Sequence, residues 1–155
     1  LTKLEELNLF DNHIKEIKGL NDLTNLKRLY LGSNRLKEIK GLDSLRGLEF
    51  LNLEKNFIKE LEGLDSLGNL ILLAIKRNSI EEIKNIGHLT RLRRLDLAFN
   101  EITEIKGLCG LENLEFIDLR GNPVYEEELN LGSKKIEVKL SDAKDLRSYC
   151  RLKGA

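Results

Sequence analysis

Leucine and isoleucine recur along this chain at a fixed interval of 22 residues. In the first unit the apolar positions are Leu4, Leu7, Leu9, Ile14, Ile17, Leu20 and Leu23. The same positions are apolar in each following unit, without insertion, as far as Val124. A constant period of this length is typical of a solenoid, in which each unit packs against the next. We therefore expect a stacked repeat protein with one continuous core.

Each unit contains one segment that is predicted to be a strand. Around Leu7 and Leu9 apolar and polar residues alternate, which is typical of a short strand with one buried face. The segment that returns to the next strand, such as residues 20–26, is too short for a long helix. The prediction is an α/β solenoid with a concave parallel sheet of short strands and a convex side of irregular or 3₁₀ turns.

An asparagine follows every predicted strand, and these residues are Asn12, Asn34, Asn56, Asn78, Asn100 and Asn122. An asparagine side chain both donates and accepts hydrogen bonds, so it can satisfy turn backbone that would otherwise be buried and unpaired. Stacked units therefore predict a structural asparagine ladder along the solenoid. Glycine recurs later in the unit, with Asn85 once in its place, and this predicts a second bend with positive φ.

The pattern L-x-x-L-x-L-x-x-N-x-I-x-x-I-x-G-L-x-x-L resembles the leucine-rich repeat. The 22-residue length and segments such as Ile17-Lys18-Gly19-Leu20 are similar to the SDS22-like subclass of that family. The resemblance covers residues 1–125 and implies a leucine-rich repeat horseshoe. It also implies that a protein partner is recognised through the concave face.

The two ends of the chain differ in character. Leu1 occupies the slot of Leu23, so residues 1–125 are read as six repeats, of which the first starts mid-repeat without an N-terminal cap. We expect from this that the chain is a piece of a longer protein. Residues 126–155 are predicted to form a C-terminal cap. It would open with a polar loop at 126–128 and continue with a strand at about 136–140 and a helix at about 142–152.

Composition narrows the classes of function. Lysine and arginine together number 26, as do aspartate and glutamate, so bulk charge does not favour nucleic acid. The local basic cluster of Arg28, Arg35, Lys55, Lys76 and Arg77 is interpreted as solvated or paired charges. No apolar run is long enough for membrane insertion, and no signal-peptide pattern is present, which favours a cytoplasmic protein.

The sequence contains no pattern that predicts catalysis. Cys109 and Cys150 form no metal or redox motif and are expected to be ordinary apolar fillers. The two histidines lie in different parts of the repeat, so neither a metal site nor a cofactor is expected. A solenoid also offers no dry cleft in which a carboxylate pKa would be strongly shifted. We expect no enzyme activity within these residues.

Aromatic residues concentrate where the concave surface is predicted. All five phenylalanines lie on or beside the strands, whereas the core positions are leucine and isoleucine. Aromatic side chains on a solvated face are typical of protein interfaces. The predicted partner-binding residues are Phe10, Arg28, Tyr30, Phe50, Asn52, Leu72, Arg94, Asp96, Phe116 and Asp118. Phe57 and Phe99 flank an asparagine, and either packing in the turn or contact with a partner would explain them.

Three functions are compatible with this pattern. The first is an intracellular protein–protein interaction module or scaffold, for which the SDS22-like resemblance implies a phosphatase or another signalling protein as partner. The second is a secreted or surface adhesion module of internalin-like type, because such proteins also use 22-residue repeats. The third is the recognition domain of a larger enzyme or regulator. Residues outside this chain would distinguish the three.

Overall fold

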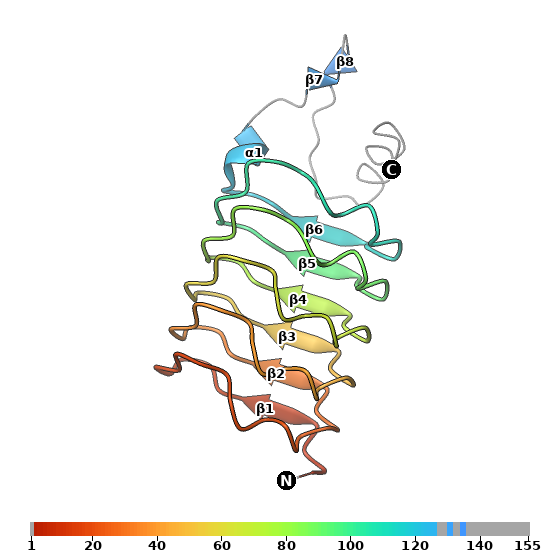
Figure 1. Ribbon diagram of the computed structural model, residues 1–155. Coiled ribbons are helices and arrows are strands. Elements are labelled where there is room, and N and C mark those ends of the chain that lie inside the picture. Colours follow the sequence, from red (N-terminus) through yellow and green to blue (C-terminus); the bar gives the residue numbers. More distant parts are fainter. Residues whose placement is uncertain (1, 127–129, 132–133, 136–155) are drawn as a thin grey trace.

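The computed structural model describes residues 2–126, 130–131 and 134–135. Six three-residue strands stack in chain order into one parallel sheet (Figure 1). They are β1 (Glu6–Asn8), β2 (Arg28–Tyr30), β3 (Phe50–Asn52), β4 (Leu72–Ala74), β5 (Arg94–Asp96) and β6 (Phe116–Asp118). The register is constant, because each strand residue pairs with the residue 22 positions later, as Leu7 does with Leu29. This confirms the predicted solenoid of parallel strands.

The return segments are made of tight turns. In the first one, the backbone N–H groups of Leu23 and Leu26 donate to the carbonyl groups of Leu20 and Leu23, at 3.0 and 2.9 Å. The same three-residue bonding recurs in the next four units. Leucine at every third residue suits a turn of three residues, because all three side chains then face the core. The return segments contain no helix, which agrees with the irregular turns expected there, and the α/β label is not confirmed.

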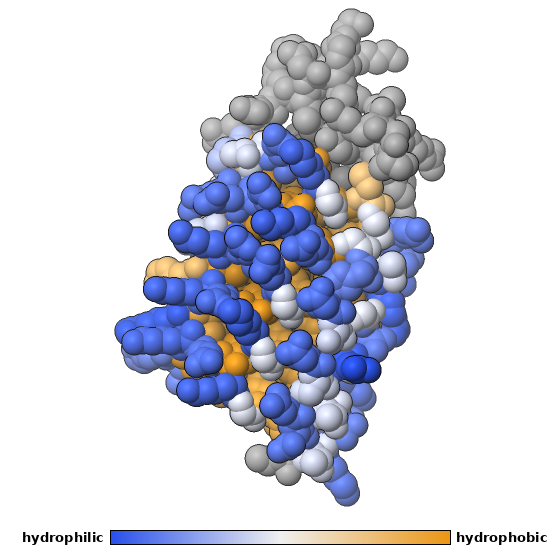
Figure 2. Space-filling view, in the orientation of Figure 1, coloured by the Kyte–Doolittle hydropathy of each residue, from blue (hydrophilic) through white to orange (hydrophobic). Residues whose placement is uncertain are grey.

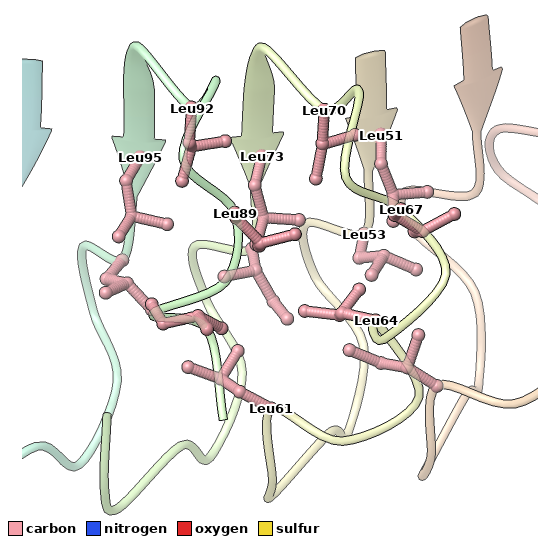
Figure 3. Close-up of a cluster of buried hydrophobic side chains, with 14 of the residues drawn as sticks. Leu51, Leu53, Leu61, Leu64, Leu67, Leu70, Leu73, Leu89, Leu92 and Leu95 are labelled. Carbon is pink, nitrogen blue, oxygen red and sulfur yellow. The ribbon is translucent and has the colours of Figure 1, made fainter. Parts of the chain in front are cut away.

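The core lies between the strands and the return turns. Leu51 and Leu73 come from strands, Leu64 and Leu67 come from return segments, and all four are fully buried (Figure 3). Leu7 in the first repeat is only partly buried, since no described unit packs below it. Figure 2 shows hydrophilic side chains in rows along the solenoid, with hydrophobic residues visible between them. Stability should therefore be approximately a sum over units and their interfaces.

The repeat pattern ends in a short helix, α1 (Pro123–Glu126). Proline is well suited to the first helical position, where its missing N–H is not needed. Glu126 belongs to this helix, so the prediction of a polar loop that starts at Glu126 is wrong at that residue. Beyond it, β7 (Asn130–Leu131) pairs antiparallel with β8 (Lys134–Lys135), an element that was not predicted. The predicted strand at 136–140 and helix at 142–152 lie outside the described residues.

Candidate functional site

Five of the six asparagines join neighbouring repeats through hydrogen bonds. The Nδ2 group of Asn78 donates to the carbonyl oxygens of Leu53 and Ile75, both at 3.0 Å. Its Oδ1 atom accepts the backbone N–H of Ile58 at 3.0 Å. Equivalent bonds are made by Asn34, Asn56, Asn100 and Asn122, all of which are buried. Asn12 is exposed and donates only within its own turn.

The residue before each asparagine has positive φ, a feature that was not predicted. This column holds Asp11, Ser33, Lys55, Arg77, Phe99 and Gly121, with φ between 53° and 70°. Glycine tolerates this backbone without cost, and aspartate adopts it more readily than most residues. The left-handed conformation costs other residues roughly 1–2 kcal/mol. Only Gly121 is a glycine, the residue type that predicts positive φ. Lysine, arginine and phenylalanine do not predict it, so this column was not predicted from the sequence.

The outward residues of the six strands form a surface that we call the sheet face. Its first column is Glu6, Arg28, Phe50, Leu72, Arg94 and Phe116. Its middle column is Asn8, Tyr30, Asn52, Ala74, Asp96 and Asp118. Nine of the ten predicted partner-binding residues lie in these two columns. Phe10 follows β1 and is 42% exposed.

The centre of the sheet face is apolar. The rings of Tyr30 and Phe50 lie 4.9 Å apart between centroids, at an angle of 40°. Leu72 lies beside Phe50 in the next strand, and all three side chains are only partly buried. Phe10 lies over Gly32, where an added Cβ atom would come within 2.9 Å of the phenylalanine Cδ2 atom. Four predicted residues are thus brought together over β1 to β4.

Phe116 is separate from this apolar centre. The guanidinium group of Arg94 lies 4.7 Å from the centroid of the Phe116 ring and occupies the strand between Phe116 and Leu72. A cation in this position is attracted by the ring quadrupole. Phe116 and Arg94 therefore form a mixed cationic and aromatic end to the sheet face, next to the buried Asp118.

Asn52, Asp96 and Asp118 have a structural role that was not predicted. The side-chain oxygen of each accepts the backbone N–H two residues later, at 2.9, 3.1 and 3.1 Å. Such local bonds stabilise the turn that ends each strand. Asp118 also accepts three hydrogen bonds from the guanidinium group of Arg120, and these bonds lower the pKa of the Asp118 carboxyl group. These oxygen atoms are already occupied by the protein itself.

Replacing Asp96 with asparagine is expected to stabilise the protein at pH 7, by up to about 1 kcal/mol. Burial raises the pKa of Asp96, so the charged form is disfavoured in the fold and lowers stability at neutral pH. Asn52 shows that an amide oxygen makes the same turn bond. Urea unfolding at several pH values would measure the gain. The gain should disappear below about pH 3.5, where aspartate is protonated in both states. A gain that is independent of pH would contradict this cause.

The two phenylalanines beside the asparagines are exposed. Phe57 is 58% and Phe99 52% exposed, so neither is buried in its turn. Phe99 contacts Gly121, where an added Cβ would lie 2.5 Å from its ring, and Arg77 lies 5.0 Å from the ring centroid. The Phe99 ring is therefore partly packed in the turn. No such packing is evident at Phe57 among the described residues.

Two further features were missed by sequence reasoning. Asn25, Asn69 and Asn113 on the return side each donate to a carbonyl group of the preceding repeat, at 2.6 to 2.8 Å. Their spacing of 44 residues, twice the repeat, was the available signal. Cys109 is exposed and disulfide-bonded, so the expectation of an ordinary apolar filler is wrong for this residue.

The described part of the chain contains no group of three or more histidine, cysteine or acidic residues that could hold a metal ion. Two surface hollows, of about 200 and 380 Å³, lie beside the bends that follow Asn56, Asn78 and Asn100. They are lined mainly by charged side chains such as Glu82 and Lys84. Within residues 2–126 and the two short strands beyond, no helix is long and apolar enough to cross a membrane.

Comparison with known proteins assigns the family. A family model for leucine-rich repeats in two copies matches residues 2–44, 24–66 and 90–148. These matches cover more than half of the chain, which therefore belongs to the leucine-rich repeat family. Proteins with this fold are typically protein-interaction modules and are generally not enzymes. Comparison with curated proteins gives no match.

Several solved structures are similar to this one. A leucine-rich repeat protein of Leptospira interrogans is 32% identical, with a TM-score of 0.71 over 76% of this chain and 31% of its own. An internalin, InlF, of Listeria monocytogenes is 24% identical, with a TM-score of 0.73 over 80% of this chain and 38% of its own. The functional domain of InlJ from the same organism is 20% identical, with a TM-score of 0.57 over 77% and 30%. The chain thus spans about a third of each of these three structures.

Proposed function

We propose that this chain is a protein-binding module that recognises its partner through the sheet face, which corresponds to the concave face of the solenoid. The observation that carries the proposal is the contiguous surface of Tyr30, Phe50 and Leu72, which is apolar, only partly buried and continuous across three strands. The core is complete without these side chains. Partly exposed aromatic residues surrounded by polar ones are typical of protein interfaces.

Charged pairs flank this apolar centre on the sheet face. Glu6 and Arg28 form an ion pair at 2.6 Å on the N-terminal side. Glu54 and Lys76 form another at 3.2 Å along the neighbouring column. Paired charges at the edge of an interface exclude unsuitable partners more than they add affinity. We infer that the energy of binding comes mainly from the apolar centre and that the partner presents a complementary apolar segment.

Affinity capture from native extract, read by mass spectrometry, tests this proposal. A double variant, Phe50→Glu and Leu72→Glu, is expected to weaken capture of the partner at least about tenfold, because it places two charges in the centre of the interface. A matched control is Thr24→Glu and Thr90→Glu, which adds the same charge at exposed return-side positions. Circular dichroism and thermal melting would confirm that both variants fold. Equal capture by both variants would show that the sheet face is not the binding surface.

The compartment of the protein and the class of its partner are also proposals. The SDS22-like repeat pattern supports an intracellular scaffold that binds a signalling protein such as a phosphatase. An adhesion module of internalin-like type is supported by two other observations. Cys109 is disulfide-bonded, and disulfides persist mainly in oxidising environments outside the cytoplasm. Two internalins also share the fold. The identity of the captured partner decides between these two functions.

The third candidate function is that of a recognition domain within a larger enzyme or regulator. The chain covers only 30 to 38% of the structures it matches, which is the observation that favours this function. It makes the same prediction for the sheet face. Any catalysis in such a protein would be carried out by residues outside this chain.

A further inference from the structure

A second surface lies along the edge of the sheet, where the chain leaves each strand. We call it the loop edge and define it by Arg35, Lys55, Phe57, Arg77 and Phe99. These five residues come from four consecutive repeats and stand immediately before or after the buried asparagines. All five are exposed. None belongs to the two strand columns that form the sheet face.

The backbone at the loop edge has long side chains in a conformation that disfavours them. Lys55, Arg77 and Phe99 follow one another in the positive-φ column, with φ of 53°, 56° and 56°. Glycine or asparagine would fit this conformation more easily, as Asn85 does at φ 59° in the other bend of the repeat. Strained residues with no structural benefit are typical of functional sites. The Phe99 ring packs against Gly121, but no ion pair among the described residues explains the long side chains of Lys55 and Arg77.

The charges at the loop edge are not neutralised. Among the described residues, none of Arg35, Lys55 and Arg77 has an ion-pair partner, and the Arg77 guanidinium lies over the Phe99 ring. By contrast, Lys18 and Lys40 at the other bend pair with Glu16 and Glu38. The guanidinium carbon of Arg77 lies over the Phe99 ring, 5.0 Å from its centroid. An arginine held in this way is well placed to bind a carboxylate.

We propose that the loop edge binds an acidic, extended protein segment whose carboxylates contact Arg35, Lys55 and Arg77 and whose apolar side chains contact Phe57 and Phe99. The presence of three cations beside two exposed aromatic rings determines this class of partner. Single-stranded nucleic acid also uses cations and aromatic rings. Single-stranded nucleic acid fits less well. The acidic residues Asp11 and Glu101 lie at the two ends of the loop edge and would repel a phosphate backbone that continued past them. Binding at the loop edge would use none of the sheet-face residues, so this proposal is independent of the proposed function.

Fluorescence anisotropy with a labelled peptide of alternating glutamate and phenylalanine tests this proposal. The wild-type protein is expected to bind the peptide with an affinity that falls as salt rises. The double variant Lys55→Asn and Arg77→Asn should weaken binding at least about tenfold. Its thermal midpoint should stay equal to or rise above that of the wild type, because asparagine tolerates positive φ. Loss of binding without loss of stability is a result that a purely structural role would not produce.

Two controls make the result decisive. Lys18→Gln and Lys40→Gln remove the same charge from the other bend and should leave peptide binding unchanged. Ser33→Asn changes a short side chain in the positive-φ column and should also have no effect. The proposal is overturned if the wild type does not bind the peptide or if the Lys18 and Lys40 control loses binding equally. It is also overturned if an oligothymidylate of matched length binds more tightly than the peptide. All these variants leave the sheet face intact, so failure here is distinguishable from failure of the proposed function.

Discussion

Replacing Asn78 with alanine is expected to destabilise the protein by about 2–4 kcal/mol. The Asn78 side chain is buried and bonds two repeats together. Its removal leaves the buried N–H group of Ile58 without this partner, and a buried unsatisfied group costs roughly 1–3 kcal/mol. The carbonyl groups of Leu53 and Ile75 each lose one of two donors and keep the amide groups of Asn56 and Asn100. Urea unfolding followed by circular dichroism would measure the loss of the free energy of unfolding.

Asn12→Ala is the matched control for the asparagine ladder. Asn12 has the same place in the repeat, but it is exposed and its amide bonds only the carbonyl groups of Leu9 and Phe10. We expect a loss below about 1 kcal/mol, which is the usual net value of a solvated hydrogen bond. Similar losses at Asn12 and Asn78 would mean that the inter-repeat bonds contribute little. Stability would then depend on the leucine core alone.

Replacing Gly63 with alanine is expected to have the second large effect. Gly63 has φ of 76°, and a Cβ atom there would overlap the carbonyl oxygen of Ile39 in the preceding repeat. The positive φ alone costs alanine roughly 1–2 kcal/mol, and the enforced separation of two repeats adds about 1–3 kcal/mol. Thermal unfolding should show a much lower midpoint for Gly63→Ala than for the wild type.

Gly19→Ala separates the two causes. Gly19 has almost the same φ, 75°, but a Cβ atom there would meet nothing within 4 Å, because the first described repeat has no bend below it. Only the cost of the backbone conformation should remain, so the loss should be about 1–2 kcal/mol. If the two glycines proved equally sensitive, close stacking of the bends would not be the reason for glycine at this position.

Much of the repeat architecture was predictable because the same pattern of apolar and polar residues occurs in every unit. The alternation around Leu7 and the return spacing of Leu20, Leu23 and Leu26 recur with one period, so a weak local signal is repeated in each unit. Regular stacking then leaves little freedom in strand order or register. The end of the repeat array was less predictable. The pattern fails after Val124, and a single four-residue helix with Pro123 at its start carries no periodic signal.

The candidate surfaces were predictable only in part. Alternation correctly placed Phe50 and Leu72 on the outer side of the strands. It could not show that Asn52, Asp96 and Asp118 bond their own backbone, because the choice between solvent, partner and turn is made by local geometry. It also placed Phe116 in one column with Phe50 and Leu72, with Arg94 between Leu72 and Phe116, as the register confirms. It could not show that Arg94 lies over the Phe116 ring.

The amino-acid sequence alone determined the repeat length, the buried leucine and isoleucine positions and the place of each asparagine. These follow from hydrophobic periodicity, which acts on every unit in the same way. Only the tertiary structure decided which side chains become neighbours across units. Stacking puts Lys55, Arg77 and Phe99 in successive slots of positive φ, leaves Phe57 exposed and sets Asn78 between two backbones. Those properties arise from contacts between residues 20 to 25 positions apart, and they exist only once the repeats have stacked.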